Sequence, residues 1–343
     1  MKKAISLVMA LCLVLALCAC GGTGTTTNTE APATEAPATD APAADTPTDE
    51  GKVYHIGICQ LVQHDALDAA TLGFREKLTE LLGEGNVVFD EQNAQNDVQT
   101  CTTICNQFVA DGDDLILANA TPALQAAASA TGDIPILGTS ITDYATALSL
   151  TDFTGSTGMN ISGTSDLAPL DQQADMLLEL FPDAKNVGIL FCSAEPNSFY
   201  QAGVISEYLE SKGVTCTNYT FSDSNDVAAV TLTACEASDV LFIPTDNTAA
   251  SNTELINNVA LPTGTPIIAG EEGICVGCGV ATLSISYYDI GTAAGEMAYE
   301  ILVNGADVST MDVRFAPQVT KKYNSAICES LNIEVPEDYV AIG

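Results

Sequence analysis

The chain has 343 residues, with 10 Lys and Arg against 45 Asp and Glu, and a formal net charge of −35 at pH 7. So acidic a chain is poorly suited to binding nucleic acid or anionic lipid headgroups. Arg75 and Arg314 are its only arginines, so an anionic ligand group has to be held mainly by hydroxyls, amides and helix N-termini.

The first twenty residues have the pattern of a secretion signal. Lys2 and Lys3 precede an apolar run over residues 4–19, which is too short for a stable membrane span. The run ends in Leu-Cys-Ala-Cys, which resembles a bacterial lipobox and implies lipidation of Cys20; the alternative is an ordinary signal with Cys20 unmodified. Residues 21–51 hold no aromatic or branched aliphatic residue, which predicts a disordered tether.

From residue 52 onward, apolar runs of strand length alternate with amphipathic helical patterns. The expected strands are 53–61, 86–90, 114–119, 134–138, 158–161, 186–192, 214–220, 239–243, 266–269 and 279–284. The expected helices are 66–83, 97–110, 121–130, 168–180, 197–212, 226–236 and 248–258. This alternation predicts an α/β fold in which parallel sheets are covered by helices on both faces.

The second half of this region repeats the first. Residues 55–78 align without gaps on residues 186–209. Two later pairs of segments also align, 113–127 with 238–252 and 134–140 with 265–271, and the three segments follow one another in the same order in both halves. Two similar lobes, each with its own sheet, are therefore expected rather than one long sheet.

Six polar loops follow expected strands, at the edge where open parallel sheets bind ligands. They are 63–65, 119–122 and 139–143 in the first half, and 193–198, 244–248 and 270–273 in the second. Two lobes that face each other with these edges form a cleft.

Several ordered blocks resemble the substrate-binding lipoproteins of ABC transporters with the type I periplasmic-binding fold, in the branch associated with tryptophan and tyrosine uptake. They include "VQHDALDAATLGF", "DDLILANATPALQAA", "ISGTSD", "VLFIPTDNTAAS" and "YDIGTAAGEMAYEIL". The resemblance implies a monomer on the extracellular face of a bacterial membrane that hands a small solute to an ABC permease. In that branch the solute is an aromatic or related amino acid. It implies neither catalysis nor a cofactor.

In this fold the chain crosses between lobes three times, expected here near 162–167, 282–286 and 314–318. One lobe then comprises 52–164 and 284–315, and the other 165–283 and 316–343. The small residues Ser162, Gly163 and Thr164 suit a hinge.

For an amino-acid ligand, each ligand group has candidate partners. Thr121, Asn197 and Ser198 are expected near the carboxylate, because each lies near a helix start. Asp246 is the first choice for the ammonium, before Asp143 and Glu271. Aromatic wall candidates are Tyr144, Phe199, Tyr287 and Tyr288, and further polar candidates are Gln63, His64, Ser165, Asp166 and Asn247. Alternatively, Thr121 and either Asp246 or Asn247 only cap helices.

Other chemistries find little support in the sequence. Cys275 and Cys278 form a CxxC motif that suits a small disulfide loop or half of a zinc site, but no second CxxC accompanies it, so no metal site is expected. Most cysteines are expected to be buried thiols. Two alternatives to amino-acid binding remain: the same fold binding a sugar or nucleoside, or serving as a surface sensor, and a secreted hydrolase using Glu271 or Glu272 with Asp246.

Overall fold

A computed structural model describes residues 51–342. The predicted signal, the tether up to residue 50 and the lipidation of Cys20 lie outside the described residues. Within the described part, no helix has the length and apolar character that crossing a membrane requires.

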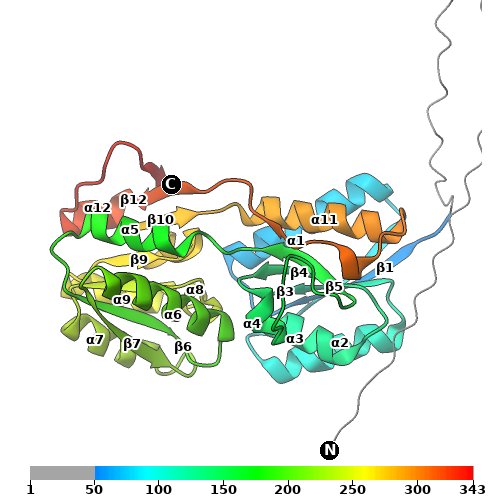
Figure 1. Cartoon of the computed structure of the whole chain (residues 1–343), viewed down its shortest axis with the longest axis horizontal. Helices are drawn as coiled ribbons and strands as arrows, with labels where there is room; N and C mark the ends of the chain where they lie inside the picture. Colours follow the sequence, from blue (N-terminus) through cyan, green and yellow to red (C-terminus); the bar gives the residue numbers. More distant parts are fainter. Residues whose placement is uncertain (1–50, 343) are drawn as a thin grey trace, which may run out of the picture. The chain divides into compact units, whose positions relative to one another are not determined.

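Lobe 1 is built on a six-stranded parallel sheet with the order β11-β5-β4-β3-β1-β2 (Figure 1). Its strands are β1 (Tyr54–Gln60), β2 (Val87–Asn93), β3 (Leu115–Asn119), β4 (Ile136–Ile141), β5 (Ile161–Ser165) and β11 (Arg314–Phe315). The strands β3, β4 and β5 are buried along their whole length. Burial along the whole strand is typical of parallel strands covered on both faces.

Lobe 2 has a seven-stranded sheet with the order β13-β12-β10-β9-β8-β6-β7, in which only the β10–β12 pair is antiparallel. Its strands are β6 (Asn186–Cys192), β7 (Thr215–Phe221), β8 (Val240–Ile243), β9 (Ile267–Ala269), β10 (Ala281–Ser284), β12 (Thr320–Asn324) and β13 (Val340–Ile342). The order β10-β9-β8-β6-β7 repeats β5-β4-β3-β1-β2 of lobe 1. The predicted duplication into two α/β lobes is confirmed.

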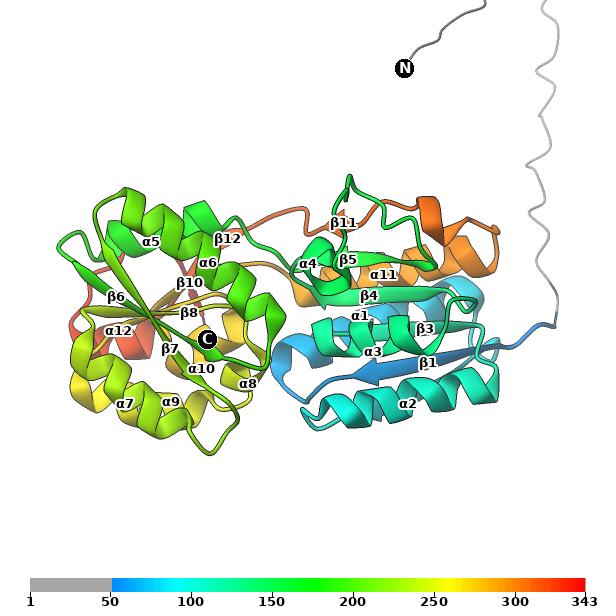
Figure 2. The same cartoon turned by 60° about the horizontal axis from the view of Figure 1, so that its bottom comes forward.

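Helices cover both faces of each sheet (Figure 2). In lobe 1, α1 and α11 cover one face and α2, α3 and α4 the other; their bounds are α1 (Asp65–Leu82), α2 (Val98–Asp111), α3 (Thr121–Ala130), α4 (Tyr144–Leu148) and α11 (Tyr287–Leu302). A short 3-10 helix, η1, covers Val308–Thr310. Lobe 2 carries α5 (Leu170–Leu180), α6 (Pro196–Ser211), α7 (Val227–Ala237), α8 (Asn247–Ala250), α9 (Thr253–Thr263), α10 (Glu272–Cys278) and α12 (Ser325–Leu331).

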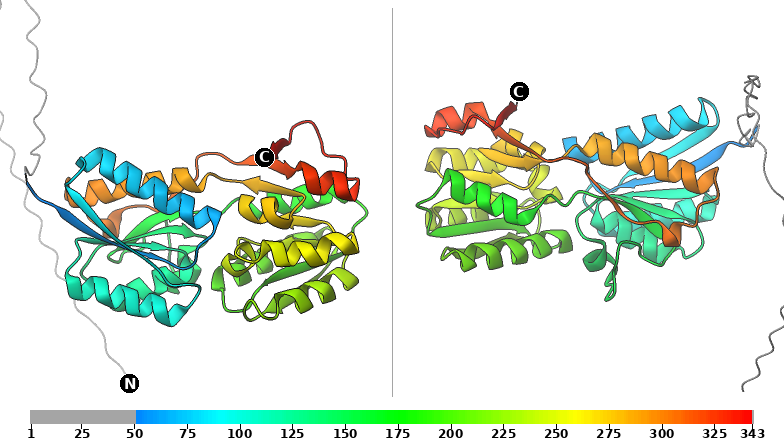
Figure 3. Two further views of the ribbon diagram at one scale, coloured as in Figure 1. Left: turned by 180° about the vertical axis from the view of Figure 1, so that it is seen from behind. Right: turned by 45° about the horizontal axis from the view of Figure 1, so that its top comes forward.

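Three segments connect the sheets: β5 to α5, β10 to α11, and β11 to β12 (Figure 3). Ser162, Gly163 and Thr164, expected to form a hinge, instead lie buried inside β5. Ser165 belongs to the sheet of lobe 1 and Ser284 to that of lobe 2, one residue away from the boundaries drawn from the sequence. The division of the connecting segments between the lobes stays a prediction.

Gly163 is required by a close approach of two strands. Its φ is +139°, and a Cβ at this position would lie 2.0 Å from the carbonyl oxygen of Gly138 on β4. L-residues rarely adopt this φ, and the neighbouring backbone cannot move without disturbing the sheet.

We therefore expect Gly163→Ala to lower the free energy of unfolding by about 2 kcal/mol, through backbone strain and overpacking. Urea unfolding measures this change. The control is Gly203→Ala on α6, where nothing lies within 4 Å of an added Cβ. This variant should unfold at the same or a higher urea concentration, because alanine favours the helix by up to about 1 kcal/mol. Equal midpoints for wild type and Gly163→Ala would contradict the requirement.

Candidate ligand-binding site

A small polar cavity lies where the loops of the two lobes meet. Its volume is ≈ 10 Å³, room for about one water molecule, so an amino acid enters only if the lobes separate. Five of the six predicted loops contribute to it; the loop 119–122 does not. The lining residues are His64, Leu67, Ser140, Thr142, Asp166, Asn197, Thr245, Asp246, Asn247, Ala250, Glu271 and Tyr287.

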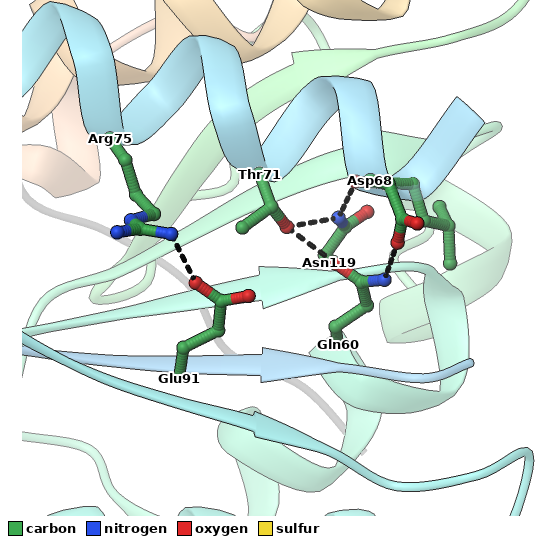
Figure 4. A network of polar contacts seen from close by, with 7 residues as sticks. Gln60, Asp68, Thr71, Arg75, Glu91 and Asn119 are labelled. Carbon is green, nitrogen blue, oxygen red and sulfur yellow. Dashed lines mark hydrogen bonds and ion pairs between the residues drawn. The ribbon is translucent and has the colours of Figure 1, made fainter. Parts of the chain in front are cut away.

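A buried polar network fixes the start of α1 at the cavity (Figure 4). Asn119, at the end of β3, donates to the carbonyl oxygen of Leu67 (2.8 Å) and to Thr71 Oγ1 (2.9 Å). Thr71 donates to Gln60 Oε1 (2.7 Å), and Gln60 Nε2 donates to Asp68 (2.6 Å). The ends of β1 and β3 thus hold the first turn of α1, including Leu67 in the cavity wall.

Asp246 lines the cavity, but its carboxylate already has three donors from lobe 2. Oδ2 accepts from the backbone N–H of Cys192 (2.7 Å) and from Ser198 Oγ (2.7 Å), and Oδ1 accepts from the N–H of Ala249 (2.7 Å). Asp246 is therefore the N-cap of α8 and a buried link between β6, α6 and α8, as the capping alternative predicted. Little acceptor capacity is left for a ligand ammonium.

Glu195 is a buried acid that the sequence did not single out. Its carboxylate accepts from the backbone and side chain of Asn247 (2.9 and 2.7 Å) and of Thr248 (both 2.8 Å). Burial and this neighbouring acid raise the pKa of Asp246, while the donors to Asp246 oppose the rise. Glu195 directly precedes Pro196 and α6, but its side chain makes no cap hydrogen bond on α6 and binds the start of α8 instead, so no local signal points to its role.

Three buried polar atoms of cavity-lining residues have no hydrogen-bond partner in the described part: Asp166 Oδ1, Asn197 Oδ1 and Ser140 Oγ. Asp166 Oδ2 accepts from the Tyr287 hydroxyl (2.9 Å), which leaves Oδ1 open. Asn197 Nδ2 donates to the Thr245 carbonyl (3.0 Å) and lies 3.3 Å from Glu195 Oε2, so the amide orientation is fixed. Buried polar atoms are rarely left unpaired, so these atoms are candidates for contact with a ligand.

Asn197 therefore presents an acceptor. The sequence placed Asn197 near a ligand carboxylate because it lies near a helix start; its side-chain N–H groups are used by Thr245 and Glu195. The local sequence gives no sign of this orientation, since it depends on residues about fifty positions away.

Of the aromatic candidates, only Tyr287 lines the cavity. Tyr144 is packed in the core beneath β4 and β5, and its hydroxyl donates to the carbonyl oxygens of Gly138 (3.1 Å) and Thr164 (3.2 Å). Phe199 and Tyr288 are about half exposed and lie outside the cavity lining. The wall is thus made of one aromatic ring with the aliphatic groups of Leu67 and Ala250.

Four polar candidates lie near the cavity without lining it. Thr121 is buried in the first turn of α3, whose N-cap is Ala120, so Thr121 is not the cap either. Asp143 caps α4 through the N–H of Thr146 (2.7 Å), and Ser198 holds Asp246. Ser165 Oγ donates to the carbonyl oxygen of Thr142 (3.1 Å) and accepts from Leu167 N–H.

Gln63, also predicted to contact the ligand, is exposed. It lines a separate, more open hollow beside His64, where the two lobes meet.

The cavity is acidic. Asp166, Asp246 and Glu271 line it, and no lysine or arginine does. Burial raises the pKa of Asp166 to about 6 and that of Glu271 to about 7. Glu271 is the N-cap of α10 and accepts from the N–H groups of Gly273 (2.6 Å) and Ile274 (2.5 Å). The two predicted structural arginines form ion pairs elsewhere, Arg75 with Glu91 and Arg314 with Glu300.

Two hydrogen bonds join the lobes at the mouth of the cavity. His64 Nε2 lies 3.3 Å from Asn247 Oδ1, and Asn96 Nδ2 donates to Thr248 Oγ1 (2.9 Å). Because Asn247 Nδ2 donates to Glu195, its Oδ1 faces His64, and the imidazole donates from Nε2. Burial lowers the pKa of His64, so the neutral imidazole is favoured in this arrangement.

We expect His64→Ala to raise the Kd for the ligand about 5-fold, because one inter-lobe hydrogen bond contributes about 1 kcal/mol to the closed form. Isothermal titration calorimetry measures the change. His55→Ala is the matched control, since His55 lies on β1 and outside the cavity. Equal Kd values for the two variants would contradict a role of His64 in closure.

The nine cysteines of the described part are free thiols, eight of them buried and Cys216 half-buried. Cys275 and Cys278 lie on α10, where each sulfur contacts a carbonyl oxygen, of Gly279 and Ile274 respectively. The prediction of buried thiols is confirmed.

A sequence profile of the family described as ABC transporter substrate binding protein matches residues 55–342. The chain belongs to this family. It is 37% identical over 271 residues to a tyrosine-binding protein of Clostridioides difficile strain R20291, which spans 77% of this chain and 78% of that protein.

Solved structures of substrate-binding proteins and related domains have the same fold. An ABC domain from Streptococcus pneumoniae in complex with L-Trp is 31% identical with a TM-score of 0.80, over 83% of this chain and 97% of that one. The ligand-free, open structure of a substrate binding protein with adhesive properties from Clostridium difficile is 37% identical with a TM-score of 0.65, over 84% of this chain and 99% of that one. A conserved domain protein from Vibrio cholerae is 29% identical with a TM-score of 0.81, over 84% and 99%.

Proposed function

We propose that this substrate-binding protein binds an aromatic amino acid, of the tyrosine or tryptophan type, between its lobes. The observation that carries the proposal is the pair of open acceptors in the cavity, Asp166 Oδ1 and Asn197 Oδ1. A buried carboxylate oxygen and an amide oxygen call for a group with several N–H donors and a positive charge, which an α-ammonium provides. Asp166 thus takes the role that the sequence assigned to Asp246.

The ligand carboxylate has a different set of partners on lobe 1. Ser140 Oγ is open, and the first turn of α1 has no side-chain cap at His64. The first N–H groups of a helix lack intrahelical partners and favour an anion. On lobe 2, by contrast, Asp246 and Glu195 occupy the start of α8, and Glu271 occupies the start of α10. The aromatic side chain then packs against Tyr287 and Leu67.

The arrangement of the lobes supports this placement. The chain has the higher sequence identity to the open C. difficile structure but the higher TM-score to the L-Trp complex, 0.80 against 0.65. Since the sheets within each lobe share one fold, a difference in lobe orientation accounts for this reversal. The ≈ 10 Å³ cavity also fits a closed form.

The setting of the protein follows from the family and the leader. We propose that lipidated Cys20 anchors it to the extracellular face of a bacterial membrane, and that it delivers its ligand as a monomer to the permease of an ABC importer. Mass spectrometry of the membrane fraction tests the anchor, because a diacylglycerol thioether on Cys20 changes the mass of the N-terminal peptide.

Ligand titration tests the binding proposal directly. The protein has no tryptophan, so the emission of added L-tryptophan reports its own binding. At 100 times its Kd, a ligand adds about 2.7 kcal/mol to the stability of the folded protein. We expect L-tryptophan or L-tyrosine to raise the melting temperature, and glucose and adenosine to leave it unchanged. A shift with a sugar or nucleoside alone would replace this proposal by the other ligand class.

A further inference from the structure

The cavity holds more negative charge than an amino acid neutralises. Asp246 and Glu195 are each held by hydrogen-bond donors of their own lobe, so their surroundings change little when the lobes separate. Asp166 and Glu271 remain, and no Lys or Arg lines the cavity. A zwitterionic ligand contributes one ammonium but also one carboxylate. Two protein carboxylates and one ligand carboxylate then share a single positive charge in a site with no room for bulk water.

Glu271 is the acid left without a counter-ion. Under the proposed function the ligand ammonium pairs with Asp166, whose second oxygen already accepts from Tyr287. Glu271 accepts two backbone N–H groups but contacts no cation among the described residues. Lys322, the nearby base, is paired with Glu272 (2.6 Å), which also accepts from Ser284 Oγ.

We propose that closure of the cleft on a zwitterionic amino acid takes up a proton on Glu271, whereas a cationic amine with the same ring binds without this uptake. The inference rests on the proposed function. When the lobes separate, water reaches Glu271 and its charge is well solvated. When they close on a zwitterion, desolvation and the negative charge of Asp166 favour the neutral carboxylic acid. A cationic amine brings no carboxylate of its own, so only Asp166 and Glu271 share its positive charge and Glu271 can stay ionised.

The direction of the pH dependence follows from linkage. The pKa of Glu271 is raised to about 7 in the closed arrangement, above the ordinary value near 4.5. A carboxyl that binds a proton on closure makes the affinity highest at low pH and weaker as pH rises toward 7, with a plateau above. The groups facing Glu271 are Asp166 and Tyr287, with His64 and Asp246 across the cavity and Glu272, Cys275 and Cys278 on its own helix α10. His64 acts in the opposite sense, since its lowered pKa means that closure releases a proton.

Calorimetric titration of the full-length protein at pH 7.0 in phosphate and in Tris measures the proton count, because the two buffers differ in ionisation heat. For L-tryptophan we expect a measurable net uptake of protons at this pH, because a buried Glu271 with its pKa raised to about 7 is partly protonated and an exposed carboxyl is not. For tryptamine we expect an uptake near zero. Glu271→Gln, which mimics the neutral acid, should bind L-tryptophan with less proton uptake than wild type; His64 contributes equally to both.

Two results would overturn the inference while leaving the proposed function intact. One is L-tryptophan binding with the same heat in both buffers and the same proton count in Glu271→Gln. The other is equal uptake with tryptophan and tryptamine. If Glu271→Gln does not fold, two measurements on the wild-type protein still test the inference. They are the binding heat of L-tryptophan in the two buffers and its Kd between pH 5 and 8. Absence of binding by every aromatic amino acid would overturn the proposed function, and the inference with it.

Discussion

Asp166→Ala is expected to raise the Kd for the amino acid more than a hundredfold. The substitution removes the carboxylate that pairs with the ligand ammonium in a site closed to water. Removing one partner of a buried charge pair costs about 3 kcal/mol or more, which is over two orders of magnitude in Kd. Titration calorimetry with L-tryptophan and L-tyrosine measures the change.

Tyr287→Phe is the matched control for Asp166. It removes the hydroxyl that donates to Asp166 Oδ2 but keeps the ring in the cavity wall. The affinity should fall about tenfold, well short of the change for Asp166→Ala, since one hydrogen bond to a charged group is worth about 1.5 kcal/mol. A wild-type Kd in Asp166→Ala would show that the ammonium binds elsewhere.

Asp246→Ala is expected to destabilise the fold rather than to act only on binding. It leaves the N–H groups of Cys192 and Ala249 and the hydroxyl of Ser198 buried without an acceptor. At about 1 to 3 kcal/mol for each unpaired group, the loss of unfolding free energy should reach about 4 kcal/mol. Urea unfolding of the ligand-free protein measures it.

Asp143→Ala provides the comparison for Asp246. Asp143 is also an N-cap, but it is half-buried and its contact is with the N–H of Thr146 on the five-residue α4. Its loss should cost about 1 kcal/mol. If Asp246→Ala melted like wild type and failed to bind, Asp246 would be the ammonium partner that the sequence favoured.

The alternation of apolar runs and helical patterns was enough to predict most strands of both sheets, because buried parallel strands leave a strong local signal. The aligned halves also predicted two similar lobes. The prediction was wrong where the signal is weak: residues 248–258 were expected as one helix, whereas α8 and α9 are separated at residues 251–252. The short strands β11, β12 and β13 and the helices α4, α10, α11 and α12 were not expected, and the expected strand 158–161 meets β5 only at Ile161.

The position of the site was predictable, because polar loops after strands mark the binding edge of such sheets. The role of each acid was not. Asp166 and Asp246 are both aspartates in polar loops, and they differ only in how many donors surround them in the folded protein. That number depends on Cys192 and Ser198, about fifty residues from Asp246, so no local pattern reveals it. The same holds for Tyr144, whose hydroxyl bonds are made by neighbouring strands.

The duplication of the lobes bears on the orientation of a bound ligand. In the aligned halves, the three acids Glu195, Asp246 and Glu271 of lobe 2 occupy the places of His64, Thr121 and Ser140 in lobe 1. Duplication alone would yield a pseudo-symmetric binding site with no preferred orientation for the ligand. Divergence at these three pairs placed acids on lobe 2 where lobe 1 has an imidazole and two hydroxyls. Under the proposed function, this difference would turn the carboxylate of a zwitterionic ligand toward lobe 1.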